Sequence, residues 1–141
     1  MNENSIPQMT IWRRTFLEAL DHATLVVNAD NLIGALGEAR ARAFDARQAL
    51  QRATEAGEHA EAMLILSDAY AAGKNAEVRA AWLRLQWDTD PVCIDILEVQ
   101  RRRRVDLEIE ERALDGFTRQ YELAKLELRL AIAQFHFLAG E

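Results

Sequence analysis

The sequence predicts an all-α protein built on a long antiparallel helical hairpin of the coiled-coil type, with a short connecting helix and an N-terminal helix. Ala, Leu, Glu and Arg are abundant among the 141 residues, while two prolines and six glycines leave little material for strands and turns. Two segments carry apolar residues at strict seven-residue spacing, as two paired helices of a coiled coil do. One of these seams is rich in alanine, and the other carries larger side chains.

Residues 1–29 form an N-terminal segment of mixed character. Its first residues are polar and include Pro7, and Thr10 can cap a short helix over residues 11–22. The apolar run at residues 25–27 fits either a helix or an extended segment. The first twenty residues contain charges and no unbroken apolar stretch, so we do not expect a signal peptide.

The alanine seam predicts a long helix over residues 30–72. Asp30 or Asn31 can cap its start, and Gly73 can end it. Small side chains in the seam allow a second helix to approach closely. The predicted seam residues are Leu36, Ala39, Ala43, Ala46, Leu50, Ala53, Gly57, Ala60, Leu64 and Ala71.

Two further helices follow. Asn75 can cap a short helix over residues 76–87, and Asp90 followed by Pro91 predicts the start of a last helix over residues 91–138. This last helix supplies the larger side chains of the second seam. They are Leu107, Leu114, Tyr121, Leu128 and Phe135. We expect the two long helices to run antiparallel, because only a short helix separates them, and the whole chain to form a single domain.

Charge predicts the register of the hairpin. If facing residues have numbers that sum to about 162, the run Arg101–Arg104 faces Glu55, Glu58 and Glu61. The acidic residues between 106 and 115 then face arginines between 40 and 52, so opposite charges meet in both zones. Arg103 and Glu110 fall in the seam and should form a polar layer. Their expected neighbours are Gly57 and Ala60 for Arg103, and Ala53 for Glu110.

The run Arg101–Arg104 also raises the alternative of a nucleic-acid contact through Arg101, Arg102 and Arg104. Four successive helical residues sweep through about 300°, so they cannot form one basic face. We expect Asp106 to pair with Arg102 and Glu108 with Arg104 at i,i+4 spacing. The net charge of −6 further argues against a surface that attracts nucleic acid or anionic lipid as a whole.

The sequence points away from catalysis. Di-iron sites need Glu-x-x-His pairs, and each of the three histidines has alanine at that position instead. Cys93 lies near a predicted helix start, where a thiol pKa can be lowered, but no catalytic histidine accompanies it, so a small buried thiol is the better interpretation. We expect no catalytic residue, no metal and no cofactor. One cysteine and the lack of a long apolar stretch predict a cytoplasmic protein without a membrane span.

The segment between the long helices carries the element Gly73-Lys74-Asn75-Ala76-Glu77-Val78-Arg79. This Gly-Lys-Asn-Ala-Glu-x-Arg element, followed by a long charged helix, resembles small coiled-coil proteins encoded by phages and prophages. The resemblance covers about residues 40–135 and carries no catalytic signature. It implies a role near phage DNA recombination or replication.

Several large apolar residues lie off both seams, and a monomer rarely exposes so much apolar surface. They predict the interface of a homodimer, the commonest closed assembly. The candidate residues are Leu83, Trp87, Leu126, Leu130 and Phe137. We therefore expect a non-enzymatic interaction or scaffolding protein that also binds a protein partner. The alternative is an accessory nucleic-acid-binding protein in phage recombination or replication.

Overall fold

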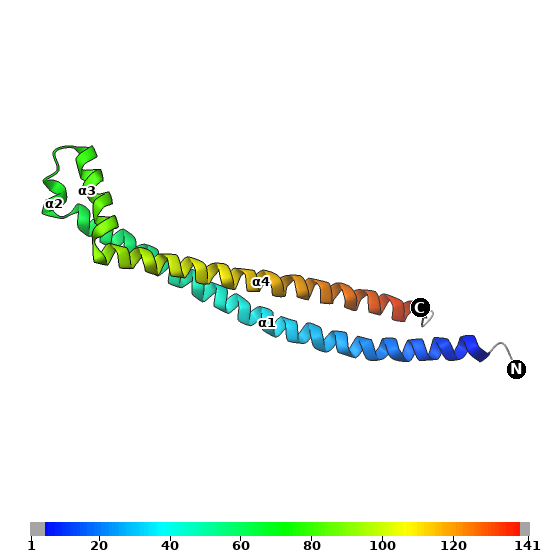
Figure 1. The fold of residues 1–141 in the computed structure, drawn as a ribbon. Coiled ribbons are helices and arrows are strands. Elements are labelled where there is room, and N and C mark those ends of the chain that lie inside the picture. The colour runs from blue at the N-terminus through cyan, green and yellow to red at the C-terminus, as the bar shows by residue number, and fades with distance from the viewer. Residues whose placement is uncertain (1–4, 139–141) are drawn as a thin grey trace. The chain divides into compact units, whose positions relative to one another are not determined.

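The structure, a computed structural model, describes the backbone of residues 5–138 and the side chains of residues 23–137. The described residues form four helices and no strand: α1 (Ser5–Ile65), α2 (Asp68–Ala71), α3 (Ala76–Thr89) and α4 (Pro91–Leu138) (Figure 1). The long helices α1 and α4 pack against each other and exchange side-chain hydrogen bonds. The predicted all-α helical hairpin is therefore confirmed.

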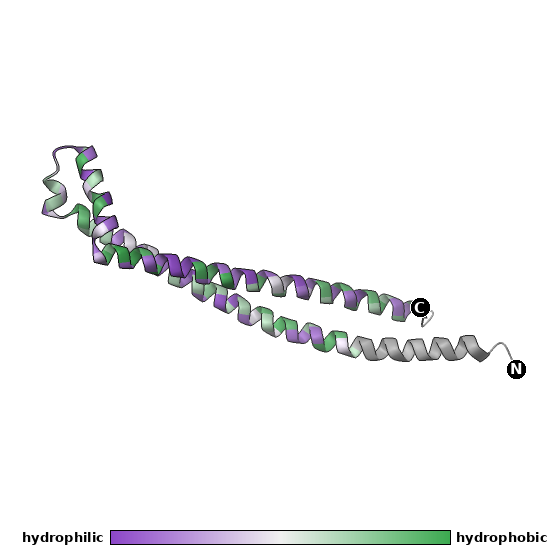
Figure 2. Cartoon of the chain, viewed as in Figure 1, coloured by the Kyte–Doolittle hydropathy of each residue, from purple (hydrophilic) through white to green (hydrophobic). Residues whose placement is uncertain are grey.

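The chain divides into two compact parts. Residues 41–112 form the part we call the turn part, and the described residues on either side of it, 5–40 and 113–138, form the terminal part. Along the described lengths of both long helices, hydrophilic and hydrophobic residues alternate at short intervals (Figure 2). Accordingly, none of the described helices has a stretch that is both long and apolar enough to cross a membrane.

α1 is longer at its start than the sequence predicts. It runs unbroken from Ser5, so the expected boundary between a helix over residues 11–22 and a long helix capped by Asp30 or Asn31 is absent. No proline or glycine interrupts residues 8–33. The half-buried Leu25, Ala29 and Leu32 also continue the seam upstream at the same alternating spacing. Packing along the seam thus stabilises a continuous helix at Asp30 and Asn31, although either residue could have capped a helix start.

α1 also ends earlier than predicted, at Ile65 instead of residue 72. Ser67 starts the separate helix α2, because its hydroxyl accepts a hydrogen bond of 3.3 Å from the backbone N–H of Tyr70. Gly73 is not the end of α1 and lies in the turn between α2 and α3. There its carbonyl accepts a 3.2 Å hydrogen bond from the guanidinium of Arg79.

Local capping signals place the next two helices correctly. The side chain of Asn75 accepts a 2.9 Å hydrogen bond from a backbone N–H of the first turn of α3, which ends two residues later than predicted, at Thr89. Asp90 accepts a 2.8 Å hydrogen bond from the N–H of Val92 and so caps α4, which has the predicted bounds.

The alanine seam is confirmed in the turn part. Residues at alternating spacings of three and four are buried or half-buried along α1, namely Ala43, Ala46, Leu50, Ala53, Gly57, Ala60 and Leu64. The matching positions of α4 are Cys93, Ile96, Gln100, Arg103, Leu107 and Glu110, and within this set only Arg103 is exposed. Ala71 lies beyond the end of α1 and is exposed, so its assignment to the seam is wrong.

The terminal part continues the same pattern. Its α1 seam residues are Leu25, Ala29, Leu32, Leu36 and Ala39, of which Ala39 is completely buried. Its α4 seam residues are Leu114, Phe117, Tyr121, Ala124, Leu128 and Ala131. Phe135, predicted to close the seam of the last helix, is 42% exposed.

The register of the turn part differs from the predicted one. Arg42 bonds Glu110 at 3.1 Å and Arg47 bonds Glu111 at 3.2 Å, so facing residue numbers sum to 152 and 158. The early end of α1 explains the shift, because the chain leaves α1 at Ile65 and enters α4 26 residues later instead of 19. The prediction that the acidic zone of α4 faces arginines of α1 is confirmed by these two pairs.

The same shift changes the neighbours of the polar seam residues. The side chain of Gln100, and not that of Arg103, lies beside Gly57. Glu110 is half-buried and pairs with Arg42. The expected neighbours of Arg103 and Glu110 are therefore wrong, although both residues do occupy seam positions.

Candidate interaction surfaces

α4 carries a second apolar stripe outside its seam, which we call the outer stripe. It consists of Leu123, Leu126, Leu130, Ala133 and Phe137, at spacings of three and four residues. These spacings place its members on one face of the helix, opposite the face formed by the seam. Leu126 is 54%, Leu130 64% and Phe137 83% exposed. The three α4 residues that the sequence assigns to an interface thus lie on one accessible face, and their role in an interface stays a prediction.

The other two predicted interface residues, Leu83 and Trp87, belong to the turn part and lie on α3. Both are half-buried, whereas Val78 and Leu85 of the same helix are about half exposed. Leu83 and Trp87 therefore offer less accessible apolar surface than the outer stripe does.

α3 is held to α2 by aromatic packing. The rings of Tyr70 and Trp82 meet edge to face with centroids 6.1 Å apart, and the guanidinium of Arg79 lies 6.0 Å from the Tyr70 centroid. These contacts give the Arg of the Gly-Lys-Asn-Ala-Glu-x-Arg element a structural role in closing the turn.

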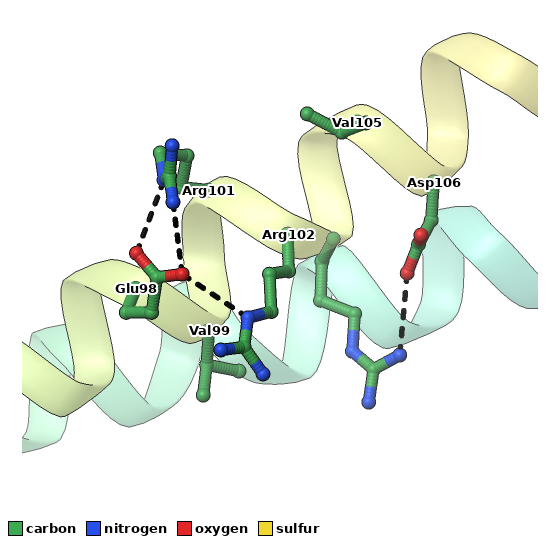
Figure 3. Close-up of a pocket in the computed structure, with 7 residues that line it drawn as sticks. Glu98, Val99, Arg101, Arg102, Val105 and Asp106 are labelled. Carbon is green, nitrogen blue, oxygen red and sulfur yellow. Dashed lines mark hydrogen bonds and ion pairs between the residues drawn. The ribbon is translucent and has the colours of Figure 1, made fainter.

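Glu98 lies between Arg101 and Arg102 and binds both guanidinium groups (Figure 3). Its carboxylate lies 2.9 Å from Arg101 Nη2 and 3.1 Å from Arg102 Nε. Hydrogen bonds from Arg101 and then Arg102 hold the pKa of Glu98 below its ordinary value, and Glu98 in turn raises the pKa of Arg101. Two of the three candidate nucleic-acid residues are thus already paired within α4.

The remaining arginines of the run do not gather into a basic face. Arg103 pairs with Asp106 at 3.4 Å, and Arg104 is exposed without an ion pair to any described residue. The expected pairs of Arg102 with Asp106 and of Arg104 with Glu108 are wrong. So is the expected pairing of the run with Glu55, Glu58 and Glu61 of α1, because Arg101, Arg102 and Arg103 bind carboxylates of α4 instead. The open pocket of about 470 Å³ at this site is lined by both signs of charge.

Cys93 is a buried seam residue, as the interpretation of a small buried thiol predicts. Burial raises the pKa of its thiol, and the nearby negative charge of Asp90 raises it further. The expected effect of the helix start on this pKa is thus overcome by desolvation and by the capping carboxylate.

The described side chains include no buried polar or charged group and no cluster of three or more metal-ligating residues. Among the exposed apolar side chains of the described chain, those of the outer stripe recur at helical spacing over the longest stretch. No protein-family model matches the chain, and comparisons with curated proteins and with solved structures return no significant match.

Proposed function

We propose that this protein is a non-enzymatic interaction protein that self-associates and presents its helices as a scaffold. The observation that supports this proposal is the outer stripe, which keeps three leucines and a phenylalanine more than half exposed on one face. A soluble monomer gains nothing from such a stripe, whereas burial stabilises an assembly by roughly 25 cal/mol per Å² of apolar surface.

The basic run supports a nucleic-acid function less well, since Glu98 already binds Arg101 and Arg102. Salt separates the two functions. Phosphate binding weakens steeply as salt rises, whereas an apolar interface does not. A phage or prophage origin, a separate protein partner and a cytoplasmic location stay predictions from the sequence.

Sedimentation equilibrium at micromolar concentration tests the proposal. We expect the wild-type protein to be oligomeric, and Leu126→Glu combined with Leu130→Glu to be monomeric with unchanged helix content. Val105→Glu combined with Ile109→Glu is the matched control, because these residues have the same spacing on α4 and are 50% and 57% exposed. The control should stay oligomeric. A monomeric wild-type protein would contradict the proposal.

A further inference from the structure

We propose that Ser67 is a conformational hinge, at which α1 and α2 join into one continuous helix when the contact between Tyr70 and Trp82 opens. In this second state of the turn part, α2 continues α1 as far as the residue before Gly73. The inference is independent of the proposed self-association. Three features support it: the backbone at Ser67, the side chains that keep α2 apart from α1, and the closure of the turn.

The backbone at Ser67 differs from a helix in one dihedral angle. Its φ of −74° is already helical, whereas its ψ of 150° is extended. Before this residue, the N–H of Leu66 donates a helical hydrogen bond of 3.1 Å to the carbonyl of Ala62. After it, the N–H of Ala71 donates one of 3.2 Å to the carbonyl of Ser67. Helical hydrogen bonds are thus present on both sides of the extended residue.

Joining the two helices adds backbone hydrogen bonds. The N–H groups of Asp68 and Ala69 donate to no other described residue. In a continuous helix they would donate to the carbonyls of Leu64 and Ile65. No proline or glycine lies between Ile65 and Gly73, so the sequence permits a helix across the joint.

Side chains of α2 and α3, which lie side by side at the turn, hold the first state in place (Figure 1). The ring of Tyr70 meets that of Trp82 with centroids 6.1 Å apart, and the guanidinium of Arg79 lies 6.0 Å from the Tyr70 centroid. The hydroxyl of Ser67 adds the 3.3 Å cap from the N–H of Tyr70. Because α2 has only four residues, it is not stable as a separate helix without these contacts.

The closure of the turn couples the hinge to the aromatic contact. The seam holds α1 against α4. Asp90 fixes the junction of α3 and α4, because it makes hydrogen bonds with backbone groups of both helices. With both ends of the turn held, α2 cannot change its direction at Ser67 without changing its angle to α3. Tyr70 must therefore leave Trp82 when α2 joins α1.

α3 is long enough to close the turn in the joined state. The seven residues 66–72 lengthen α1 by about 10 Å, and packed helices lie about 8–10 Å apart. The end of the joined helix is then about 14 Å from the start of α4, which is less than the roughly 21 Å length of α3. Residues 73–75 take up the difference, so the joined state requires no change in α4.

Amide exchange tests the hinge through one pair of variants. Trp82→Ala removes the aromatic contact. Asp68→Pro prevents joining, because proline at the first position of α2 keeps Ser67 extended and has no N–H for a continuous helix. We expect the amide of Ala69 to exchange at least tenfold more slowly in Trp82→Ala than in the combined variant. Only the first protein can donate this amide to the carbonyl of Ile65. The Cα chemical shift of Ser67 should move to a helical value in the same protein.

Leu85→Ala is the matched control, because Leu85 is a 53% exposed residue of α3 outside the aromatic contact. Adding Asp68→Pro to it should leave the exchange of Ala69 unchanged. Ser67→Ala, which removes the cap and keeps both rings, should slow this exchange in the same direction as Trp82→Ala. Equally fast exchange of Ala69 with and without Asp68→Pro, in the Trp82→Ala and the Ser67→Ala proteins alike, would overturn the hinge.

Discussion

Gln100 of α4 donates a hydrogen bond of 3.1 Å across the turn part to the carbonyl oxygen of Ala53 in α1. The amide reaches this carbonyl because Gly57, one turn further along α1, has no side chain. A Cβ atom at Gly57 would collide with the amide nitrogen of Gln100. The glycine thus leaves space in the seam for the polar side chain of Gln100, whose amide N–H donates a hydrogen bond to a backbone carbonyl of the opposite helix.

This relationship predicts coupling between the two residues. Gly57→Ala should change stability little, because a gain of about 1 kcal/mol in helix propensity is offset by displacement of the amide, worth about 0.5–1.5 kcal/mol. In a Gln100→Ala background the same change should stabilise by about 1 kcal/mol. Urea unfolding of the four proteins measures the coupling. An equal effect of Gly57→Ala in both backgrounds would show that the two residues do not interact.

Ala53 itself tests how closely the helices approach. It is buried in the seam, so Ala53→Leu should destabilise by roughly 1–3 kcal/mol through overpacking. Ala56→Leu, on the exposed side of the same helix, should be nearly neutral because both residues are good helix formers. Thermal midpoints followed by circular dichroism give the comparison, and equal midpoints for the two variants would reject the close approach.

Replacing Arg103 by leucine should make the folded protein more stable but its helix register less specific. Arg103 borders an open groove of about 540 Å³ in which Ala46 and Ala49 leave space for a larger apolar residue. Arg103→Leu should raise the thermal midpoint while retaining helix content, because leucine fills the seam and the exposed pair with Asp106 contributes little. It should also add species with other registers or oligomeric states in sedimentation velocity.

Arg104→Leu is the control for this substitution, since Arg104 is exposed outside the seam and should alter neither property. An Arg103→Leu protein with an unchanged midpoint and a single unchanged species would argue against any role for Arg103 in the choice of register.

Glu98 predicts a pH dependence of local stability. Because its pKa is lowered in the folded protein, its contribution is present above the ordinary glutamate pKa and is lost as the pH falls through the lowered value. Replacing Arg101 and Arg102 by alanine should return the pKa to its ordinary range. An NMR titration of the Glu98 side-chain carboxyl carbon in the wild-type and variant proteins measures this pKa. Identical midpoints in the two proteins would show that the arginines do not lower the pKa of Glu98.

Features that depend on neighbouring residues in the chain could be predicted from the sequence. Asn75 and Asp90 bind backbone N–H groups within three residues of themselves, so the starts of α3 and α4 follow from local chemistry. The seam and the exposure of Leu126 follow in the same way from helical periodicity.

The missed features depend on competition between contacts. α1 ends at Ile65 because α2 can pack Tyr70 against α3, and this early end alone moves the hairpin register. The arginine partners were missed for a related reason. Glu98 and Asp106 both lie within reach of the run, and the choice between them depends on side-chain geometry that spacing does not specify.

The two parts of the chain differ in how far each can fold without the other: the turn part can form first, and the terminal part depends on it. The turn part is one continuous segment, so its helices can meet after closing only the loop formed by α2 and α3. The terminal part is made of two segments, residues 5–40 and 113–138, that are far apart in the sequence, and the entropy cost of bringing them together is small only when the turn part has already formed. Amides of residues 113–137 should therefore exchange with solvent through partial openings, whereas the most protected amides of residues 41–112 should exchange only on global unfolding.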